Sequence, residues 1–241
     1  MVEDKINKTL ADLFTPNPEI LNVPPPGGNT KTGELSKISL LFLDVDGVLN
    51  GTYSQIVHGT LPHPDSGSPH KGFVYGEEAI DKVAASLINM VCKATGSLIV
   101  ISSAWRIGFT MEDLRTMMGT LGIDTSLIIG RTDTLHYEEK NRGNQIERFL
   151  KDVVTPEGRE LMYKHNRLGE WVKFEEKVDV TTYAIVDDDN DMLESQIDNF
   201  VQTTFLDGLK LSHVLRLGQI LANDDEFYIN RLAGAPVRPL W

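Results

Sequence analysis

Residues 40–50 limit the possible folds more than any other stretch of the chain; they read Leu-Leu-Phe-Leu-Asp-Val-Asp-Gly-Val-Leu-Asn. Four successive apolar residues predict a strand that is buried on both faces. The strand ends in Asp44 and Asp46, whose side chains point to the same side because side chains alternate along a strand. Two like charges this close destabilise each other unless a cation lies between them. The stretch therefore predicts a divalent cation site, most simply for Mg²⁺; the alternative is a solvated acidic turn.

The composition indicates a globular protein with a hydrophobic core. Of the 241 residues, 41% are hydrophobic and 24% are charged. A domain usually has about 100–200 residues, so we expect one domain with an elaboration. The sequence predicts no membrane span and no signal peptide. Its single cysteine, Cys92, excludes an internal disulfide and fits a cytoplasmic location.

The net charge of −12 argues against binding along an extended nucleic-acid duplex, which requires a basic surface. An acidic protein that handles a phosphorylated partner must rely on a metal and a few local cations. We therefore expect a nucleotide or a nucleic-acid end as the substrate. The sequence makes no prediction about the oligomeric state.

The chain divides into three predicted regions. Residues 1–36 combine a short amphipathic helix with an arm rich in proline and glycine, and residues 37–223 form the catalytic domain. Within that domain, residues 51–75 read as a long loop without secondary structure that can serve as a lid. Three histidines of this region match no zinc pattern: His58, His63 and His70. Residues 224–241 form a tail.

Polar side chains also follow two later strands. A helix at 77–95 precedes a buried strand at 97–101, which ends in Ser102. Another buried strand at 183–186 ends in four carboxylates within residues 187–191. Because ligands gather at the carboxyl ends of parallel strands, we expect these groups to meet the first two aspartates. The other expected elements are helices at 110–121, 141–152 and 212–222 and strands at 127–129 and 200–204.

These groups suit phosphoryl transfer, which needs a cation, an oxygen nucleophile, a proton donor and donors for the phosphate oxygens. Asp44 can attack phosphorus and form an aspartyl phosphate that water hydrolyses. Asp46 can protonate the leaving alkoxide and then deprotonate the water. A strand-end hydroxyl and a basic side chain can bind the phosphate oxygens.

The sequence resembles the haloacid-dehalogenase (HAD) phosphatase superfamily. Its motif I is similar to residues 44–49, motif II to Ser102 after an apolar strand, and motif IV to Asp187 and Asp188. The closer likeness is to HAD domains of RNA-repair type and, more loosely, to the phosphatase domain of phage polynucleotide kinase-phosphatase. It is carried by residues 43–50, 101–106, 142–146 and 186–189 and covers about residues 38–222. The implied fold is α/β, a Rossmann-like three-layer sandwich with a mostly parallel central sheet and a small lid insertion after the first strand.

The resemblance implies a role for each matching residue. Asp44 is then the nucleophile and a metal ligand, and Asp46 is the acid/base that offers its main-chain carbonyl to Mg²⁺. Ser102 binds the phosphate. Asp188 is the matching metal ligand, with Asp187 and Asp191 in support.

The superfamily's third motif is usually a lysine, and the chain offers Arg142 or Lys140 at this place without deciding between them. Arg106 can also reach a phosphate, since arginine suits bidentate oxygen binding. We expect Ser103, Arg106 and Gly47 to contact the substrate.

The sequence thus predicts a Mg²⁺-dependent phosphatase, a phosphoric monoester hydrolase. Two alternatives remain: a non-catalytic or regulatory phosphate-binding protein, and a phosphotransferase whose acceptor is not water. The intact pair Asp44 and Asp46 argues against the pure binding protein, because binding alone needs no acid/base.

Overall fold

The computed structural model describes residues 36–58, 80–132, 141–152, 163–165, 171–173 and 178–227. Residues 1–35 of the expected arm, residues 59–75 of the expected lid and the end of the tail from residue 228 lie outside this range. Lys140, His63 and His70 lie outside it as well.

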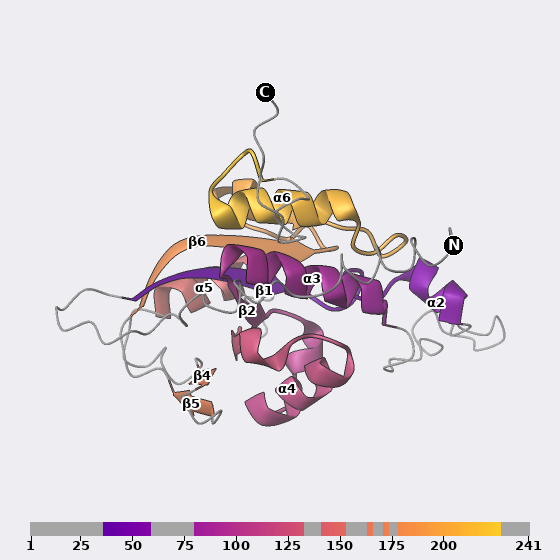
Figure 1. Cartoon of the computed structure of the whole chain (residues 1–241), viewed down its shortest axis with the longest axis horizontal. Coiled ribbons are helices and arrows are strands. Elements are labelled where there is room, and N and C mark those ends of the chain that lie inside the picture. The colour runs from indigo at the N-terminus through magenta and orange to yellow at the C-terminus, as the bar shows by residue number, and fades with distance from the viewer. Residues whose placement is uncertain are drawn as a thin grey trace, which may run out of the picture.

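A five-stranded sheet forms the centre of the molecule (Figure 1), and all its strands are parallel. Its order is β3-β2-β1-β6-β7. The strands are β1 (Ser36–Leu43), β2 (Leu98–Ile101), β3 (Ile128–Arg131), β6 (Val178–Asp187) and β7 (Phe200–Gln202). Along the chain, β2 and β3 are added on one side of β1, and β6 and β7 are then added on its other side. The direction in which strands are added therefore reverses between β1 and β6. In open parallel sheets a ligand crevice forms outside the carboxyl ends of the strands at this point.

The register of the sheet brings the strand-end residues to one level. Leu43 of β1 pairs with Ile101 of β2 and with Val186 of β6. The next residues along the three strands are Asp44, Ser102 and Asp187. Three segments that are far apart in the sequence therefore place polar side chains side by side.

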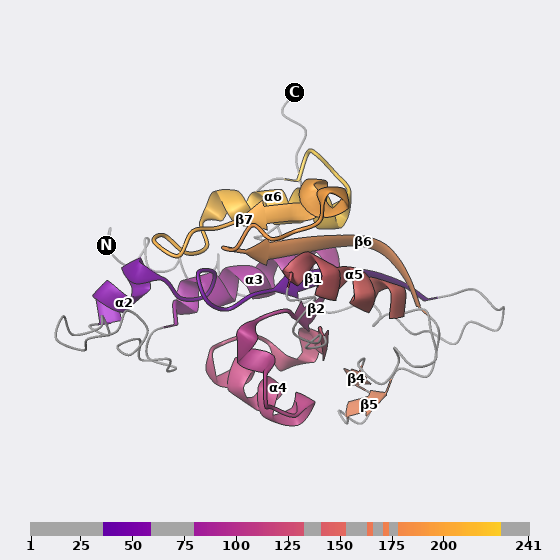
Figure 2. The same cartoon turned by 180° about the vertical axis from the view of Figure 1, so that it is seen from behind.

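Helices cover both faces of the sheet, as the opposite views in Figures 1 and 2 show. On one face, Leu41 and Leu43 share an apolar cluster with Ile88, Met118 and Leu217. These last three belong to α3 (Lys82–Thr95), α4 (Met111–Thr120) and α6 (Leu211–Ala222). The remaining described elements are α2 (Thr52–His58), α5 (Arg142–Asp152), the 3₁₀ helices η4 (Ala104–Arg106), η5 (Thr125–Leu127) and η7 (Glu194–Asn199), and an antiparallel pair, β4 (Tyr163–His165) and β5 (Trp171–Lys173).

The opposite face of β1 packs on α5. Leu40 and Phe42 share a second cluster with Ile146 and Phe149 of that helix. The rings of Phe42 and Phe149 meet edge to face, with centroids 5.6 Å apart. Helices on both sides of a parallel sheet make the three layers that we expected, and they explain why β1 is apolar on both faces. Among the described helices, none has the length and apolar character needed to cross a membrane.

The starts of α3 and β6 differ most instructively from the sequence prediction. Residues 80 and 81 lie outside α3, which begins at Lys82, because the Asp81 carboxylate accepts from the amides of Val83 and Ala84 and caps the helix. Strand β6 begins at Val178, before the predicted 183, because its first residues pair with the start of β1.

The region after β1 also differs from the expected structureless loop, because residues 52–58 form α2. Ser54 exchanges hydrogen bonds with the main chain of Gly51 at the start of this helix. The amide of Thr52 donates to the carbonyl of Phe205 at 2.8 Å. Contacts with the loop after β7, which local sequence does not reveal, thus stabilise the helix.

The fold predicts a contrast between two positions of α3. Ile88 is fully buried in the core, whereas Val83 on the same helix is 67% exposed. Ile88→Ala should lower the free energy of unfolding by about 2–5 kcal/mol, and Val83→Ala should change it by less than about 0.5 kcal/mol. Urea denaturation followed by circular dichroism measures both, and equal losses would contradict this packing.

Candidate active site

The turn after β1 is held by its own main chain and by Asn50. The carbonyl of Val45 accepts from the amides of Val48, Leu49 and Asn50. The Asn50 side chain accepts from the amide of Gly47 at 3.0 Å and donates to Asp46 Oδ1 at 2.8 Å. Asp44 extends the sheet by donating its amide to the carbonyl of Val186 at 3.1 Å. The turn therefore fixes both aspartates relative to the sheet.

Gly47 allows another segment to approach closely. It has a φ of +68°, and a Cβ atom there would lie 2.2 Å from the carboxylate carbon of Asp188. Its carbonyl accepts from the hydroxyl of Thr203 at 2.7 Å. Only a glycine fits both the left-handed backbone and this short distance.

Three carboxylates meet at the ends of β1 and β6. One oxygen each of Asp44, Asp187 and Asp188 lies within 4.8 Å of the others. Asp44 and Asp187 are buried, with side chains 6% and 1% exposed. Among the described residues, Asp44 Oδ1 and Asp187 Oδ2 accept no hydrogen bond, and each has an ion pair with Arg142 as its polar contact. Such buried, unsatisfied carboxylate oxygens fit the ligand set of a hard divalent cation.

Burial is the largest cause of the raised pKa values of these three carboxyl groups. It raises the pKa of Asp44 to about 6 and that of Asp187 to about 8. The negative charge of Asp44 raises the pKa of Asp187 further, while the guanidinium of Arg142 lowers the pKa of both. Burial and Asp189 raise the pKa of Asp188. The cluster therefore attracts protons or a metal cation.

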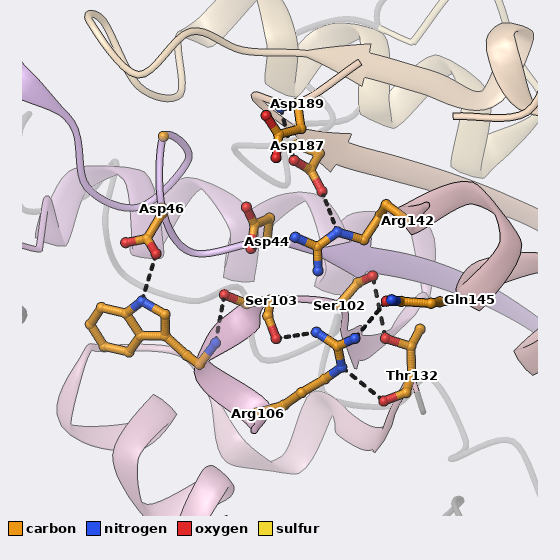
Figure 3. A network of polar contacts seen from close by, with 12 residues as sticks. Asp44, Asp46, Ser102, Ser103, Arg106, Thr132, Arg142, Gln145, Asp187 and Asp189 are labelled. Carbon is orange, nitrogen blue, oxygen red and sulfur yellow. Dashed lines mark hydrogen bonds and ion pairs between the residues drawn. The ribbon is translucent and has the colours of Figure 1, made fainter. Parts of the chain in front are cut away.

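Arg142 lies at the first position of α5 and faces this cluster (Figure 3). Its Nε lies 3.1 Å from Asp187 Oδ2 and its Nη2 lies 3.8 Å from Asp44 Oδ1, and both contacts are ion pairs. The carboxylate of Asp191 accepts from the Arg142 amide at 2.8 Å and so caps α5. Asp191, which we expected to support the metal site, lies outside the group of three carboxylates and orients Arg142 instead.

The end of β2 adds two serines. Ser102 is buried, donates its amide to the carbonyl of Leu43 at 2.8 Å and has the hydroxyl of Thr132 3.5 Å from its own. Ser103 is also buried; its side chain makes a hydrogen bond that lowers the pKa of Asp44 and accepts from the amide of Trp105. In Figure 3 Ser103 lies beside Asp44, and the Ser102 hydroxyl is directed toward Thr132.

The Arg106 side chain joins the elements around the site and forms no ion pair with the carboxylate cluster among the described contacts. It is 3% exposed, and its guanidinium donates to the carbonyl of Thr132 at 2.9 Å, to Gln145 Oε1 at 2.5 Å and to the carbonyl of Ser103. These bonds join the ends of β2 and β3 to α5. These contacts are structural, and the expected phosphate contact of Arg106 stays a prediction.

Asp46 turns away from the other carboxylates. Its Oδ2 accepts from the indole N–H of Trp105 at 2.9 Å, and Figure 3 shows its side chain directed toward that ring. Its carboxylate is not part of the group of three. The structure thus separates the two aspartates of the first strand into different surroundings.

The sequence also matches a known protein family. Residues 40–214, which are more than half of the chain, match the sequence model of one family, the HAD domain in Swiss Army Knife RNA repair proteins. The chain belongs to this HAD family. Searches of the curated proteins and of the solved structures found no significant match.

The family match confirms the resemblance inferred from the strand-end motifs and supports a phosphatase-type hydrolase. The fold agrees with an α/β HAD domain. Within this HAD domain the structure brings together the following expected residues: Asp44, Asp187, Asp188, Arg142, Ser102 and Ser103. Lys140 lies outside the described residues.

Sequence reasoning gave no role to several residues that shape the site of the HAD domain. Asn50 and Thr203 hold the turn around Gly47, Trp105 binds Asp46, and Gln145 binds Arg106. Asn50 and Trp105 lie within the motif stretches 43–50 and 101–106, so their place in the sequence could have pointed to a role in the site. Thr203 and Gln145 carry no such signal, because their contacts depend on the fold.

Gly47 provides a test of the carboxylate site, with Gly96 as the matched control. Both glycines have a φ of +68°, but a Cβ at Gly96 meets no atom within 4 Å. Gly96→Ala should cost about 1–2 kcal/mol of stability through backbone strain alone. Gly47→Ala should cost at least as much and also displace Asp188, so that the Mg²⁺-induced rise in Tm is lost. Thermal melts with and without Mg²⁺ measure both effects, and an undiminished Mg²⁺ response in Gly47→Ala would contradict the prediction.

Proposed function

We propose that this HAD domain is a Mg²⁺-dependent phosphomonoester hydrolase that works through an aspartyl-phosphate intermediate. The observation that carries the proposal is the meeting of Asp44 with Asp187, Asp188 and Arg142 at the switch point of a parallel sheet. A nucleophilic carboxylate, a set of cation ligands and a fixed guanidinium are the groups that phosphoryl transfer requires.

Asp44, Asp187 and Asp188 would hold the metal. The fit rests on three carboxylate oxygens within 4.8 Å of one another, of which the buried Asp44 Oδ1 and Asp187 Oδ2 have ion pairs with Arg142 but no hydrogen bond among the described residues. The main-chain carbonyl of Asp46 is the further ligand that the family resemblance implies. When bound, Mg²⁺ neutralises the carboxylates and the phosphate oxygens, which lowers the repulsion between nucleophile and substrate.

In the first step a carboxylate oxygen of Asp44 attacks the phosphorus, and the bond between phosphorus and the ester oxygen breaks. Asp46 gives its proton to the leaving alkoxide. Arg142 and the Ser102 hydroxyl bind the phosphate oxygens, because a fixed guanidinium and a buried donor favour the charge that develops there. Arg142 fits this role through its place at the start of α5 between two carboxylates.

In the second step water attacks the phosphorus of the aspartyl phosphate, and the bond to the Asp44 oxygen breaks. Asp46, now a carboxylate, takes the proton from the water. The products are inorganic phosphate and the free carboxylate of Asp44. Asp44 must be ionised to attack the phosphorus, and the guanidinium of Arg142 beside it favours the ionised form.

We further propose a phosphorylated nucleic-acid end as the substrate, with a free nucleotide as the second choice. The support is the family, whose model describes domains of RNA repair proteins. The net charge of −12 agrees with recognition of an end and not of a long duplex. Release of inorganic phosphate from 3′-phosphorylated RNA, 5′-phosphorylated RNA and mononucleotides compares these choices directly.

Asp44→Asn should reduce turnover on the order of 10³-fold or more while the fold is kept, because the amide is a poor nucleophile of the same size. With 2,4-dinitrophenyl phosphate, whose leaving group needs no proton, Asp46→Asn should instead retain a phosphate on the protein, since loss of the base slows hydrolysis of the aspartyl phosphate. Acid quenching followed by mass spectrometry detects this phosphate. Full activity of Asp44→Asn would refute the mechanism, and tight phosphate binding without turnover in the wild-type protein would favour a binding protein.

The raised pKa values predict how stability depends on pH in the metal-free protein. Because the folded state holds protons on Asp44 and Asp187 more tightly than the unfolded chain, their stabilising effect is complete below about pH 4. It is lost as the pH rises through about 6 and then about 8. Between pH 5.5 and pH 8.5 the free energy of unfolding should therefore fall, on the order of a few kcal/mol.

Mg²⁺ should reverse this fall, so its stabilising effect should grow with pH. Asp187→Asn is the matched variant, because it keeps the side-chain volume and removes the group whose pKa is raised most, to about 8. Its stability should vary less with pH than that of the wild type in the presence of a chelator. Urea titrations at the two pH values measure the difference, and parallel curves for wild type and variant would contradict the assignment.

A further inference from the structure

Trp105 makes a contact that the reaction proposed above leaves unused. Its indole N–H donates to Asp46 Oδ2 at 2.9 Å, while the Asn50 amide donates to Asp46 Oδ1 at 2.8 Å. Each oxygen of this carboxylate thus accepts one donor, and the two donors come from different segments. Figure 3 draws the bond from the indole. Two donors on opposite oxygens fix the rotation of a carboxylate more firmly than either one alone.

The indole itself is held in place. Trp105 lies in η4, where the Ser103 hydroxyl accepts from its amide at 3.3 Å. Its ring is partly buried and packs against the apolar cluster around α3 and α4. The neighbouring Arg106 anchors the same turn to β3 and α5. The N–H therefore occupies a fixed position before any substrate binds.

The chemistry of the indole suits an acid/base partner. An indole nitrogen donates one hydrogen bond and accepts none, so it cannot take the proton that Asp46 must transfer. A hydroxyl or an imidazole at this place could both donate and accept. The indole can hold Asp46 in one orientation through the whole reaction without entering the proton transfer.

We propose that Trp105 is a positioning residue that aims Asp46 at the leaving-group oxygen. This inference rests on the proposed function. In the step concerned, the Asp46 proton moves to the ester oxygen as the Asp44 oxygen bonds to phosphorus and the ester bond breaks. Trp105 changes neither charge nor bonding, and its effect is on the geometry of the proton transfer.

Two substrates that differ in their leaving group distinguish a positioning role of Trp105 from a purely structural role. Phenyl phosphate has a basic leaving group that requires protonation, whereas 2,4-dinitrophenyl phosphate releases an anion that does not. Trp105→Phe removes the N–H and keeps an aromatic ring. In the first turnover, measured by stopped flow at saturating substrate, it should slow release from phenyl phosphate by about 10²-fold. Release from 2,4-dinitrophenyl phosphate should change by less than about threefold.

Two further variants sharpen the result. Ile107→Val changes an exposed side chain directly after η4 and should leave both rates unchanged. Asp46→Asn should show the same split between the two esters. Because Trp105 acts through Asp46, adding Trp105→Phe to Asp46→Asn should cause no further loss.

The indole N–H signal provides a readout without substrate or metal. The chain has three tryptophans, so loss of one signal in Trp105→Phe assigns it in an NMR spectrum. The signal should exchange slowly with solvent in the wild type and faster in Asp46→Ala, which removes the acceptor.

The outcomes distinguish this inference from the function on which it rests. If the wild type releases both leaving groups and Trp105→Phe slows both equally, the positioning role is refuted and the phosphatase stands. Additive losses in the double variant would refute it as well. If the wild type cleaves neither ester and no phosphate monoester, the proposed function fails, and the positioning role fails with it.

Discussion

Repulsion between buried carboxylates is the constraint on which the rest of the structure depends. Asp44 and Asp187 lie at adjacent strand ends with almost no exposure to water, and each makes it harder to ionise the other. Arg142 relieves part of this repulsion from the start of α5. A divalent cation would relieve more of it, so the three carboxylates of Asp44, Asp187 and Asp188 suit a metal site.

Much of the surrounding structure serves to hold these groups in place. Thr203 binds the turn at Gly47, and the glycine leaves room for Asp188. Asp191 caps α5 and thereby orients Arg142, and Arg106 links the ends of β2 and β3 to the same helix. In the proposed phosphoryl transfer these contacts have no chemical part. They restrict the movement of side chains that must act together, which is where most catalytic power in such sites originates.

The sequence predicted the fold class because its signals are local. Four apolar residues before Asp44 could only suit a strand covered on both faces, and Gly96 ends α3 in the left-handed conformation that glycine favours. One helix was missed and one strand was predicted too short where a long-range contact decided the structure. Residues 52–58 form a helix that bonds to the loop after β7, and β6 is lengthened by pairing with β1. Such contacts lie more than a hundred residues apart in the chain.

By itself the sequence determined which chemical groups end each strand, since residue type and strand periodicity need no knowledge of the partner segments. It therefore indicated Asp44, Asp46, Ser102 and the acidic stretch at 187–191 as one functional set. Only the tertiary structure decided where these groups lie relative to one another. The register of β1 with β2 and β6 sets Asp44, Ser102 and Asp187 level, and the packing of η4 turns Asp46 toward Trp105. The physical reason is that pKa values, ion pairs and proton-transfer geometry depend on distances across the sheet, which the order of residues does not contain.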